Sequence, residues 1–316
     1  MPEIIKESVN WVTVDEGGAG QRIDNFLVKI LKGVPKSRIY RLVRSGELRV
    51  NSKRVDVDYR LQEGDRLRIP PIRTAQPAME KPAGPVEARL AGCVLYEDDA
   101  LVALAKPSGM AVHGGSGISR GVVEQLRLER PEAKFLELVH RLDKETSGVL
   151  LLAKKRSALV KLHQMMREGG ADKRYLTLVK GAWRNEKQHV KLPLHKFLTE
   201  SGERRVTVKE GGQASHTVFR LVKKFNEFSL LEAELKTGRT HQIRVHLAHL
   251  GFPIAGDDKY GDFPLNKELQ KRGLKRMFLH AFRLAFPHPL TGAPLVVEAP
   301  LPAELEKFVA ALESAS

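Results

Sequence analysis

A short polar segment between two apolar runs carries the residues best suited to chemistry. The segment 138-LVHRLDKETSGVLLLAK-154 places five charged or ionisable side chains directly before an apolar run: His140, Arg141, Asp143, Lys144 and Glu145. A turn needs only Gly, Asn, Asp, Ser or Pro. This turn therefore carries more charge than turning requires, and we treat it as a candidate site.

Asp143 is the first candidate nucleophile or base. It follows a segment predicted as a strand, residues 136–142, and precedes Thr146-Ser147-Gly148. A carboxylate between two core strands is poorly hydrated, and a nearby cation would keep it ionised and usable in catalysis. The alternative is a turn aspartate that hydrogen-bonds its own backbone. The turn alone favours this alternative.

A second group of candidates lies in 236-KTGRTHQIRVHLAHLGFPIAGDDKYG-261. Thr240 is predicted to cap a helix over residues 241–250, which Gly251 ends. Arg239 and Arg244 lie on the first turn and a half of this helix.

The same helix carries three histidines, which raise the question of a metal site. His246 and His249 share a face, but His241 lies five residues before His246, a spacing that aligns poorly on a helix. No acidic residue lies between them to complete an HExxH-like site. We therefore predict no metal, and histidines that pack or face the substrate.

Tyr175 begins an apolar strand after Lys173 and Arg174. Such a tyrosine is usually a core-edge residue with its hydroxyl in water, and its functional alternative is a platform on which a base stacks. The glycine-rich loop 106-KPSGMAVHGGSG-117 lacks the GxxxxGK[ST] order of a phosphate-binding loop. It predicts tight turns around a cleft and no nucleotide cofactor.

The elements that must position these residues alternate between strands and helices. Two helices are predicted, over residues 119–129 and 157–168. Strands are predicted at 93–104, 148–154, 175–181, 217–222 and 228–235. The second part of the chain, residues 91–316, is therefore predicted to be a mixed α/β domain, with a linker at 74–90.

The whole chain is basic, and the charge is concentrated near its start. Its 316 residues carry 53 Lys and Arg against 38 Asp and Glu, a net charge of +15. Residues 20–73 hold 14 basic and 6 acidic side chains, a net +8. Such a surplus predicts an anionic partner, nucleic acid first and an acidic membrane surface second.

Residues 20–73 are predicted to form a small α/β domain of two helices and short strands, after an N-terminal segment 1–19. The second helix, residues 37–45, buries Ile39, Leu42 and Val43. The exposed basic side chains before, on and after this helix are candidate phosphate ligands: Lys36, Arg38, Arg41, Arg44 and Arg49. The alternative is a solvated helix face, but the acidic partners of such a face are missing.

Composition narrows the class of protein. No apolar run reaches the roughly 18 residues of a membrane span, and residues 1–18 lack the pattern of a secretory signal. Cys93 is the only cysteine, so an intramolecular disulfide and a Cys-rich zinc site are excluded. These features predict a cytoplasmic protein with no membrane partner, and a monomer is the default.

Two resemblances connect these observations. Residues 20–55, GQRIDNFLVKILKGVPKSRIYRLVRSGELRVNSKRV, resemble an S4-type RNA-binding domain. The motifs HRLDKETSG (140–148), KPSGMAVH (106–113), TGRTHQIRVHLAHLGFPIAGDDKYG (237–261) and FLHA (278–281) resemble the RluA-type RNA pseudouridine synthases, in that family's order. The combination implies RNA as substrate, with large-subunit ribosomal RNA as the expected target and transfer RNA as the alternative.

The resemblance to the synthases implies a role for each matching residue. Asp143 matches the catalytic aspartate, Arg244 the arginine that pairs with it, and Tyr175 the tyrosine that packs on the target base. Arg141 matches the arginine that enters the RNA stack when the uridine leaves it. His140 and Thr146 would shape the turn, and the isomerisation would need no cofactor.

Two other classes of protein remain open at this stage. A hydrolytic nucleic-acid glycosidase would usually need two carboxylates, for which Glu145, Asp257 and Asp258 are available. A non-catalytic RNA-binding factor of ribosome assembly is permitted by the first domain, but would not explain the intact motif contexts of Asp143 and Arg244. The sequence does not choose between nucleophilic attack by Asp143 and a glycal route.

Overall fold

The chain folds into two compact units, residues 1–85 and 86–316. The computed structural model describes residues 8–31, 33–72, 90–114, 120–200 and 202–315. The predicted linker, residues 74–90, lies outside these ranges except for Leu90, which begins a short 3-10 helix, Leu90–Cys93. The predicted limits of the two domains, 20–73 and 91–316, stay predictions.

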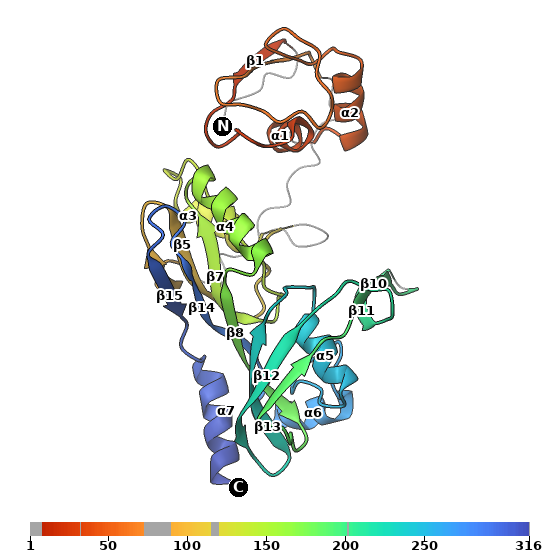
Figure 1. The fold of residues 1–316 in the computed structure, drawn as a ribbon, viewed down its shortest axis with the longest axis vertical. Helices are drawn as coiled ribbons and strands as arrows, with labels where there is room; N and C mark the ends of the chain where they lie inside the picture. The colour runs from red at the N-terminus through yellow and green to blue at the C-terminus, as the bar shows by residue number, and fades with distance from the viewer. Residues whose placement is uncertain (1–7, 32, 73–89, 115–119, 201, 316) are drawn as a thin grey trace. The chain divides into compact units, whose positions relative to one another are not determined.

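The first unit packs two helices against a three-stranded antiparallel sheet. Its elements are β1 Asn10–Thr13, α1 Ile23–Ile30, α2 Lys36–Arg44, β2 Arg49–Val50 and β3 Arg66–Ile69, with the strand order β1-β3-β2. Figure 1 labels β1, α1 and α2 of this unit. The predicted inner face of α2 is confirmed, since Ile39, Leu42 and Val43 are buried. The predicted start at residue 20 omits β1, which pairs with β3 through Trp11 and Arg68.

The second unit is built on one mixed sheet. The strands of its first half are β4 Val94–Glu97, β5 Leu101–Lys106, β6 Glu137–Leu138, β7 Ser147–Ala153, β8 Asp172–Lys180 and β9 Lys187–Val190. Those of its second half are β12 Thr217–Lys224, β13 Phe228–Leu235, β14 Leu279–Pro287 and β15 Pro294–Glu298. The main strand order is β4-β5-β7-β14-β8-β13-β12-β9, and among the strands that the structure describes only the β7–β14 pair is parallel. The predicted mixed α/β architecture is confirmed.

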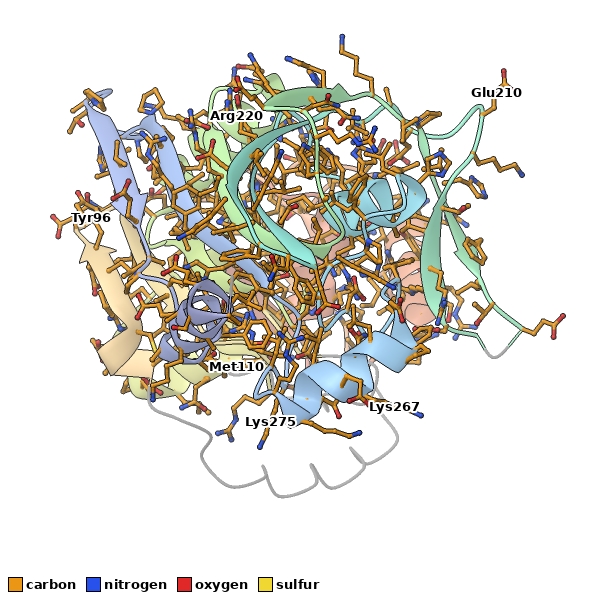
Figure 2. The ribbon with its side chains drawn as sticks, turned by 90° about the horizontal axis from the view of Figure 1, so that it is seen from below. Tyr96, Met110, Glu210, Arg220, Lys267 and Lys275 are labelled. Carbon is orange, nitrogen blue, oxygen red and sulfur yellow. The ribbon has the colours of Figure 1, made fainter. Side chains whose placement is uncertain are left out.

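Helices cover this sheet, and one hairpin projects beside it. The helices are α3 Val122–Glu129, α4 Arg156–Glu168, α5 Gln242–His249, α6 Phe263–Lys271 and α7 Ala303–Ser314. The ribbon in Figure 1 shows α4 beside β7, and α5 beside β12 and the hairpin of β10 Leu194–Leu198 and β11 Arg204–Val208. Figure 2 shows Glu210, just after β11, at the edge of the unit.

Strand β14 brings distant parts of the sequence into one row of the sheet. Its residue His280 lies opposite Ser147 of β7 on one side and Leu176 of β8 on the other. The Asp143 turn directly precedes β7, and Tyr175 is next to Leu176. Pairing through β14 therefore places the turn and Tyr175 near each other, although they are 32 residues apart in the sequence.

Close contact between β7 and β14 depends on Gly148. Its φ is +113°, and a Cβ atom at this position would lie 2.1 Å from the backbone oxygen of Ala281. Only glycine tolerates both the backbone conformation and the approach. The second half of the HRLDKETSG motif thus keeps the Asp143 turn attached to the central strand.

Three local predictions are corrected. The predicted strand over 136–142 is limited to Glu137–Leu138, because the His140 ring accepts the Leu151 N–H of β7 at 3.1 Å in place of a backbone carbonyl. The predicted strand over 93–104 is two strands, joined by a turn in which Asp98 accepts the N–H groups of Ala100 and Leu101. The predicted helix over 119–129 begins at Val122, and Ser119 lies outside the described residues.

The start of α5 is also corrected. The helix begins at Gln242, and no side-chain bond from Thr240 caps it. The preceding residue is His241, which has a φ of +52°. The Gln242 side chain organises the loop instead, because its Oε1 accepts the Arg239 N–H at 3.0 Å and the Thr237 hydroxyl at 2.8 Å. The predicted end is confirmed, with Gly251 left-handed directly after the last turn.

Candidate active site

A cleft in the second unit collects most of the predicted site residues. Its volume is about 490 Å³, and its walls come from the 139–146 turn, the second half of α4, the start of β8 and the loop from β13 into α5. Six of its lining residues are Lys or Arg: Arg141, Arg167, Lys173, Lys236, Arg239 and Arg244. Asp143 is the only acidic side chain among the described residues that line the cleft. The cleft is thus suited to an anionic ligand that meets one carboxylate.

Asp143 lies between two basic groups. Its Oδ2 accepts from Nη1 of Arg244 at 3.4 Å, and its Oδ1 lies 3.8 Å from Nε2 of His241. The backbone oxygen of Asp143 accepts the Thr146 N–H at 3.1 Å, which closes the turn. The carboxylate keeps 19% of its exposure, so a ligand in the cleft can reach it.

Arg244 is held by a second carboxylate. Its Nε and Nη2 donate to the two oxygens of Asp257 at 2.8 and 2.7 Å, a bidentate pair in which both side chains are buried. Burial alone lowers the pKa of Arg244, but the hydrogen bonds and charges of Asp257 and Asp143 raise it above the usual arginine value. Two donors are thus fixed on Asp257, and Nη1 is directed at Asp143.

Asp257 is itself fixed by its surroundings. Burial raises its pKa, but the Arg244 pair and the N–H groups of Lys259 and Tyr260, both bonded to Oδ1, lower it below the usual value. The Asn266 side chain holds the Asp257 backbone oxygen at 2.7 Å. Asp257 is therefore an ionised and well-oriented anchor for Arg244.

His241 and Tyr260 complete this network. Nδ1 of His241 lies 2.8 Å from the Tyr260 hydroxyl, which accepts the Val206 N–H at 2.9 Å. Burial lowers the pKa of His241, an effect that the Asp143 charge opposes. The Tyr260 ring also lies against the Arg244 guanidinium, with the centroid 5.2 Å away. These contacts connect the β10–β11 hairpin with Asp143 and with the Arg244–Asp257 ion pair.

The remaining carboxylates of the glycosidase alternative are poorly placed for a second role. Asp257 is occupied by Arg244, and Asp258 is 79% exposed and lies 3.5 Å from Arg244 Nη2. Glu145 lines a different cavity, together with Lys106 and Ser108. Asp143 thus has no second carboxylate beside it among the residues that line the cleft.

Tyr175 lies in the cleft wall on β8. It is 8% exposed. Burial and the nearby Asp143 charge raise the pKa of its hydroxyl above the usual tyrosine value. A neutral, mostly buried aromatic ring beside the carboxylate offers a surface on which a base can pack.

The other predicted residues of the turn also line the cleft. Arg141 is exposed, Thr146 is buried, and His140 is half-buried. Burial and the nearby Lys173 charge lower the pKa of His140 to about 4, which fits the neutral ring that accepts from Leu151. His140 therefore supports the turn from within, and Arg141 extends from it.

Arg239 also lines the cleft, whereas His246 of α5 has its partners elsewhere. Arg239 donates to the Ala214 backbone oxygen at 3.1 Å. His246 is buried between the hydroxyls of Ser215 and Thr217, and burial lowers its pKa to about 4. Among the described residues, no three His, Cys, Asp or Glu side chains gather as metal ligands.

The KPSGMAVH segment supports the Asp143 turn from the opposite side. Lys106 is 1% exposed and donates to three backbone oxygens, those of Pro107 and Met110 at 2.7 Å and Lys144 at 3.0 Å. The Gly109 N–H donates to the same Lys144 oxygen, and the Ser108 hydroxyl donates to Glu145. The predicted loop of tight turns therefore has a defined task, since it fixes the two residues after Asp143.

The first unit presents its predicted RNA ligands on two elements. Lys36, Arg41 and Arg44 are exposed on α2, and Arg38 is half-buried there. Lys36 and Arg44 lie over the Tyr40 ring, 5.5 and 5.8 Å from its centroid. Arg49 is exposed on β2, where the next residue, Val50, points into the core.

Known proteins resemble this chain over nearly its full length. Residues 100–249 match the family described as RNA pseudouridylate synthase, and residues 21–67 match the S4 domain. The chain is 52% identical over 306 residues to ribosomal large subunit pseudouridine synthase C of Yersinia pestis, with 96% of each chain covered. It is 51% identical over 312 residues to the protein of that name in Escherichia coli (strain K12), with 98% of each covered. The chain belongs to the RNA pseudouridine synthase family.

Solved structures agree with this assignment of the synthase. Human RNA pseudouridylate synthase domain containing 4 is 26% identical with a TM-score of 0.59, over 71% of this chain and 94% of that one. Human RNA pseudouridylate synthase domain containing 1 is 25% identical with a TM-score of 0.58, over 73% and 97%. These structures confirm the synthase fold expected from the motifs, and the match over residues 21–67 confirms the expected S4 domain.

Sequence reasoning missed the residues that support this synthase site. Asp257 was considered only as a second acid, and Tyr260 and Lys106 were given no role. The signal was present in GDDKYG (256–261), where two acids precede a lysine and a tyrosine in a tight turn. A buried arginine needs a paired carboxylate, so Arg244 on an apolar helix could have prompted a search for one.

Proposed function

We propose that this synthase converts specific uridines of large-subunit ribosomal RNA into pseudouridine, with Asp143 as the catalytic carboxylate. The named relatives at 50% identity and above support the substrate. The observation that carries the proposal is the cleft itself, in which a single carboxylate is oriented by Arg244 and surrounded by cations.

The target base must leave its stack before the glycosidic bond can be reached. Flipping a base costs a few kcal/mol, and stacking on an aromatic side chain offsets part of this cost. Tyr175 packs against the flipped uracil from the cleft wall. Arg141, exposed on the turn, enters the space that the uridine leaves in the RNA.

The reaction breaks one bond and forms another within the same nucleotide. The bond from C1′ to nitrogen 1 is cleaved, the held uracil turns, and a bond from C1′ to carbon 5 forms. The proton on carbon 5 is lost to solvent and nitrogen 1 gains one, so the product is an isomer of the substrate. No group is imported and no net oxidation occurs, so the chemistry requires no cofactor.

Asp143 starts this sequence by one of two routes. It attacks C1′ and forms a covalent ester, or it removes the proton at C2′ and passes through a glycal. In both routes it must be ionised and oriented, and Nη1 of Arg244 provides both conditions. His140 and Thr146 shape the turn, and Arg239 contributes positive charge at the rim of the cleft.

The S4 domain provides the second contact with RNA. Lys36, Arg38, Arg41 and Arg44 on α2 and Arg49 on β2 bind backbone phosphates, which gives affinity without selecting a base. The expected monomeric state and cytoplasmic location stay predictions. No helix among the described residues has the length and apolar character that crossing a membrane requires.

The direct test is a map of pseudouridines in ribosomal RNA from cells with and without the gene. We expect particular large-subunit uridines to lose the modification without the gene and to regain it when the gene is restored. An unchanged ribosomal map, or losses confined to transfer RNA, would overturn the proposed substrate. Purified protein that releases free uracil would favour hydrolysis instead.

A further inference from the structure

One wall of the cleft carries basic side chains that the base and ribose of a uridine do not require. His163 and Arg167 come from the second half of α4, and Lys173 comes from the start of β8. All three line the same cleft as Asp143. Uracil and ribose are neutral, so positive charge on this wall needs another partner.

No carboxylate within the described ranges neutralises these three side chains. The neighbouring Arg174 shows the contrast, since it pairs with Asp172 at 2.9 Å and with Glu232 at 3.0 Å on the other face of β8. Lys173 is only partly exposed, and burial lowers its pKa. A half-buried cation without a countercharge is costly to the folded chain and marks a binding role.

The spacing of these residues suits a linkage next to the target uridine. Lys173 and Tyr175 are two residues apart on one strand and point to the same side, about 6.6 Å apart at about 3.3 Å per residue. His163 and Arg167 are four apart and share one face of α4. A base on Tyr175 therefore brings its neighbouring backbone linkage, about one nucleotide away, beside Lys173.

We propose that Lys173, Arg167 and His163 form a subsite for the phosphodiester group adjacent to the flipped uridine. This inference rests on the proposed function and names a part of the substrate that the reaction itself does not touch. Lys173 provides the inner positive charge, and Arg167 provides a planar pair of donors from the rim. Holding this phosphate keeps the flipped nucleotide in register with Asp143.

The test combines protein variants with an RNA in which one phosphate is made neutral. The RNA is a fragment that contains a uridine mapped as converted by the wild-type protein, with a methylphosphonate at the linkage on either side in turn. Binding and conversion are measured for wild type, Lys173→Met and Arg167→Gln. Lys161→Met, an exposed cation of α4 outside the cleft, is the matched control.

We expect one of the two neutral linkages to weaken wild-type binding by about tenfold to a hundredfold, the range for a hydrogen bond to a charged group. Both cleft variants, Lys173→Met and Arg167→Gln, should bind unmodified RNA less tightly than wild type does. The neutral linkage should then reduce their RNA affinity little further. Their kcat at saturating RNA should fall as well, because without this contact the flipped nucleotide is held less well in register with Asp143. Lys161→Met should bind unmodified RNA as wild type does and keep the full effect of the neutral linkage.

Two outcomes would overturn the subsite. In the first, the fold-losses of RNA affinity caused by Lys173→Met and by the neutral linkage multiply when the two changes are combined. That result would show that Lys173 and the replaced phosphate do not interact. Alternatively, both cleft variants could bind RNA as the Lys161→Met control does. Arg167→Gln keeps the test valid if Lys173→Met fails to fold, because Arg167 is exposed. Wild-type protein that converts no uridine would instead refute the proposed function.

Discussion

The reactivity proposed for Asp143 depends on residues that do not touch the substrate. Asp257 fixes two of the donors of Arg244, and Nη1 is left for Asp143. The bonds from Arg244 to Asp257 are short, at 2.7 and 2.8 Å, whereas the bond from Arg244 to Asp143 is longer, at 3.4 Å. Arg244 is therefore anchored by Asp257, while Asp143 stays available for chemistry.

Replacing Asp257 with Asn tests whether Asp257 anchors Arg244 or only adds a negative charge near it. Breaking a buried ion pair costs about 3–5 kcal/mol, and we expect the free energy of unfolding to fall by about that amount. We also expect kcat to fall roughly a hundredfold with little change in KM, because small misplacements of catalytic groups cost about that much. Unfolding by urea and single-turnover conversion at a temperature where the variant is folded measure the two effects.

The matched control for this prediction is Asp258→Asn. Asp258 also lies near Arg244, at 3.5 Å, but its side chain is 79% exposed. Exposed pairs contribute about 0–1 kcal/mol, so the control should keep nearly full stability and activity. Equal losses in the two variants would contradict the assigned role of Asp257.

At the residue scale, the sequence predicts the side chains that line the cleft better than it predicts their supports. Asp143, Arg244 and Tyr175 were named in advance, and the structure brings all three to one cleft. The Asp257 pair was missed because it depends on the turn at residues 255–258 folding back against α5. That approach is tertiary, and no local spacing predicts it.

At the scale of elements, the Asp143 turn is fixed by the strand that follows it. Gly148 lets β7 approach β14, with no room for a Cβ between Gly148 and Ala281. Lys106 and Ser108 hold the turn from the other side through the oxygens of Lys144 and Glu145. The turn is thus restrained on both sides before RNA arrives.

Gly148→Ala tests this restraint. A left-handed conformation costs an L-residue about 1–2 kcal/mol, and overpacking adds about 1–3 kcal/mol. We expect the free energy of unfolding to fall by about 2–5 kcal/mol and activity to fall with it, measured by urea unfolding and RNA conversion. Gly92→Ala is the control, since nothing lies within 4 Å of its added Cβ and its φ is not positive. A similar loss of stability in this control would show that the close contact at Gly148 is not the cause.

Element boundaries show where sequence patterns lose their power. The inner face of α2 was predicted correctly because it follows from helical spacing alone. The start of α5 was not, since Gln242 rather than Thr240 satisfies the loop. The strand before Asp143 was predicted too long because a side chain, His140, takes the place of a backbone partner.

At the scale of the whole molecule, two basic surfaces on separate units are proposed to bind one RNA. The surplus of +15 was visible in the sequence, and so was its concentration near the start of the chain. The strand order of the large sheet was not visible in the sequence, because β14 pairs between β7 and β8 although it lies more than 100 residues away along the chain. Non-local pairing of this kind has no local pattern.

Removing charge from α2 should weaken RNA binding in a salt-dependent way. The double variant Arg38→Ala with Arg41→Ala removes two proposed phosphate contacts, and each contact contributes about 0.7–0.9 to the slope of log K against log salt. We expect the slope to fall by about 1.4–1.8, measured by titration at several salt concentrations. The control removes two exposed lysines of α6, Lys267 (labelled in Figure 2) and Lys271; an equal change there would reduce the effect to net charge.

Stability should fall in mild acid because buried histidines are kept neutral. Burial lowers the pKa of His140 and His246 from 6.5 to about 4. Between about pH 6.5 and 4 the unfolded chain binds protons that the folded chain excludes, so stability falls as pH falls. Each histidine contributes up to about 1.4 kcal/mol per pH unit in this window and nothing further below it.

His246→Gln should reduce the change of the unfolding free energy with pH by up to about 1.4 kcal/mol per pH unit, which corresponds to one proton. Urea unfolding between pH 7 and pH 5 measures this change. His195→Gln is the control, because this side chain on β10 is exposed in the folded chain as it is in the unfolded one. If His246→Gln keeps the slope of the wild type, the buried histidine is not the source of the acid sensitivity.

The central claim is that Asp143 performs the chemistry on an RNA held by the rest of the molecule. The most direct measurement compares wild type with Asp143→Asn, a change of nearly equal shape, on large-subunit ribosomal RNA. Pseudouridine is mapped at single-nucleotide resolution, and RNA affinity is measured in parallel. We predict that Asp143→Asn binds the RNA within about threefold of wild type, because phosphate contacts dominate affinity, and forms no pseudouridine. Substantial product from this variant would contradict the account.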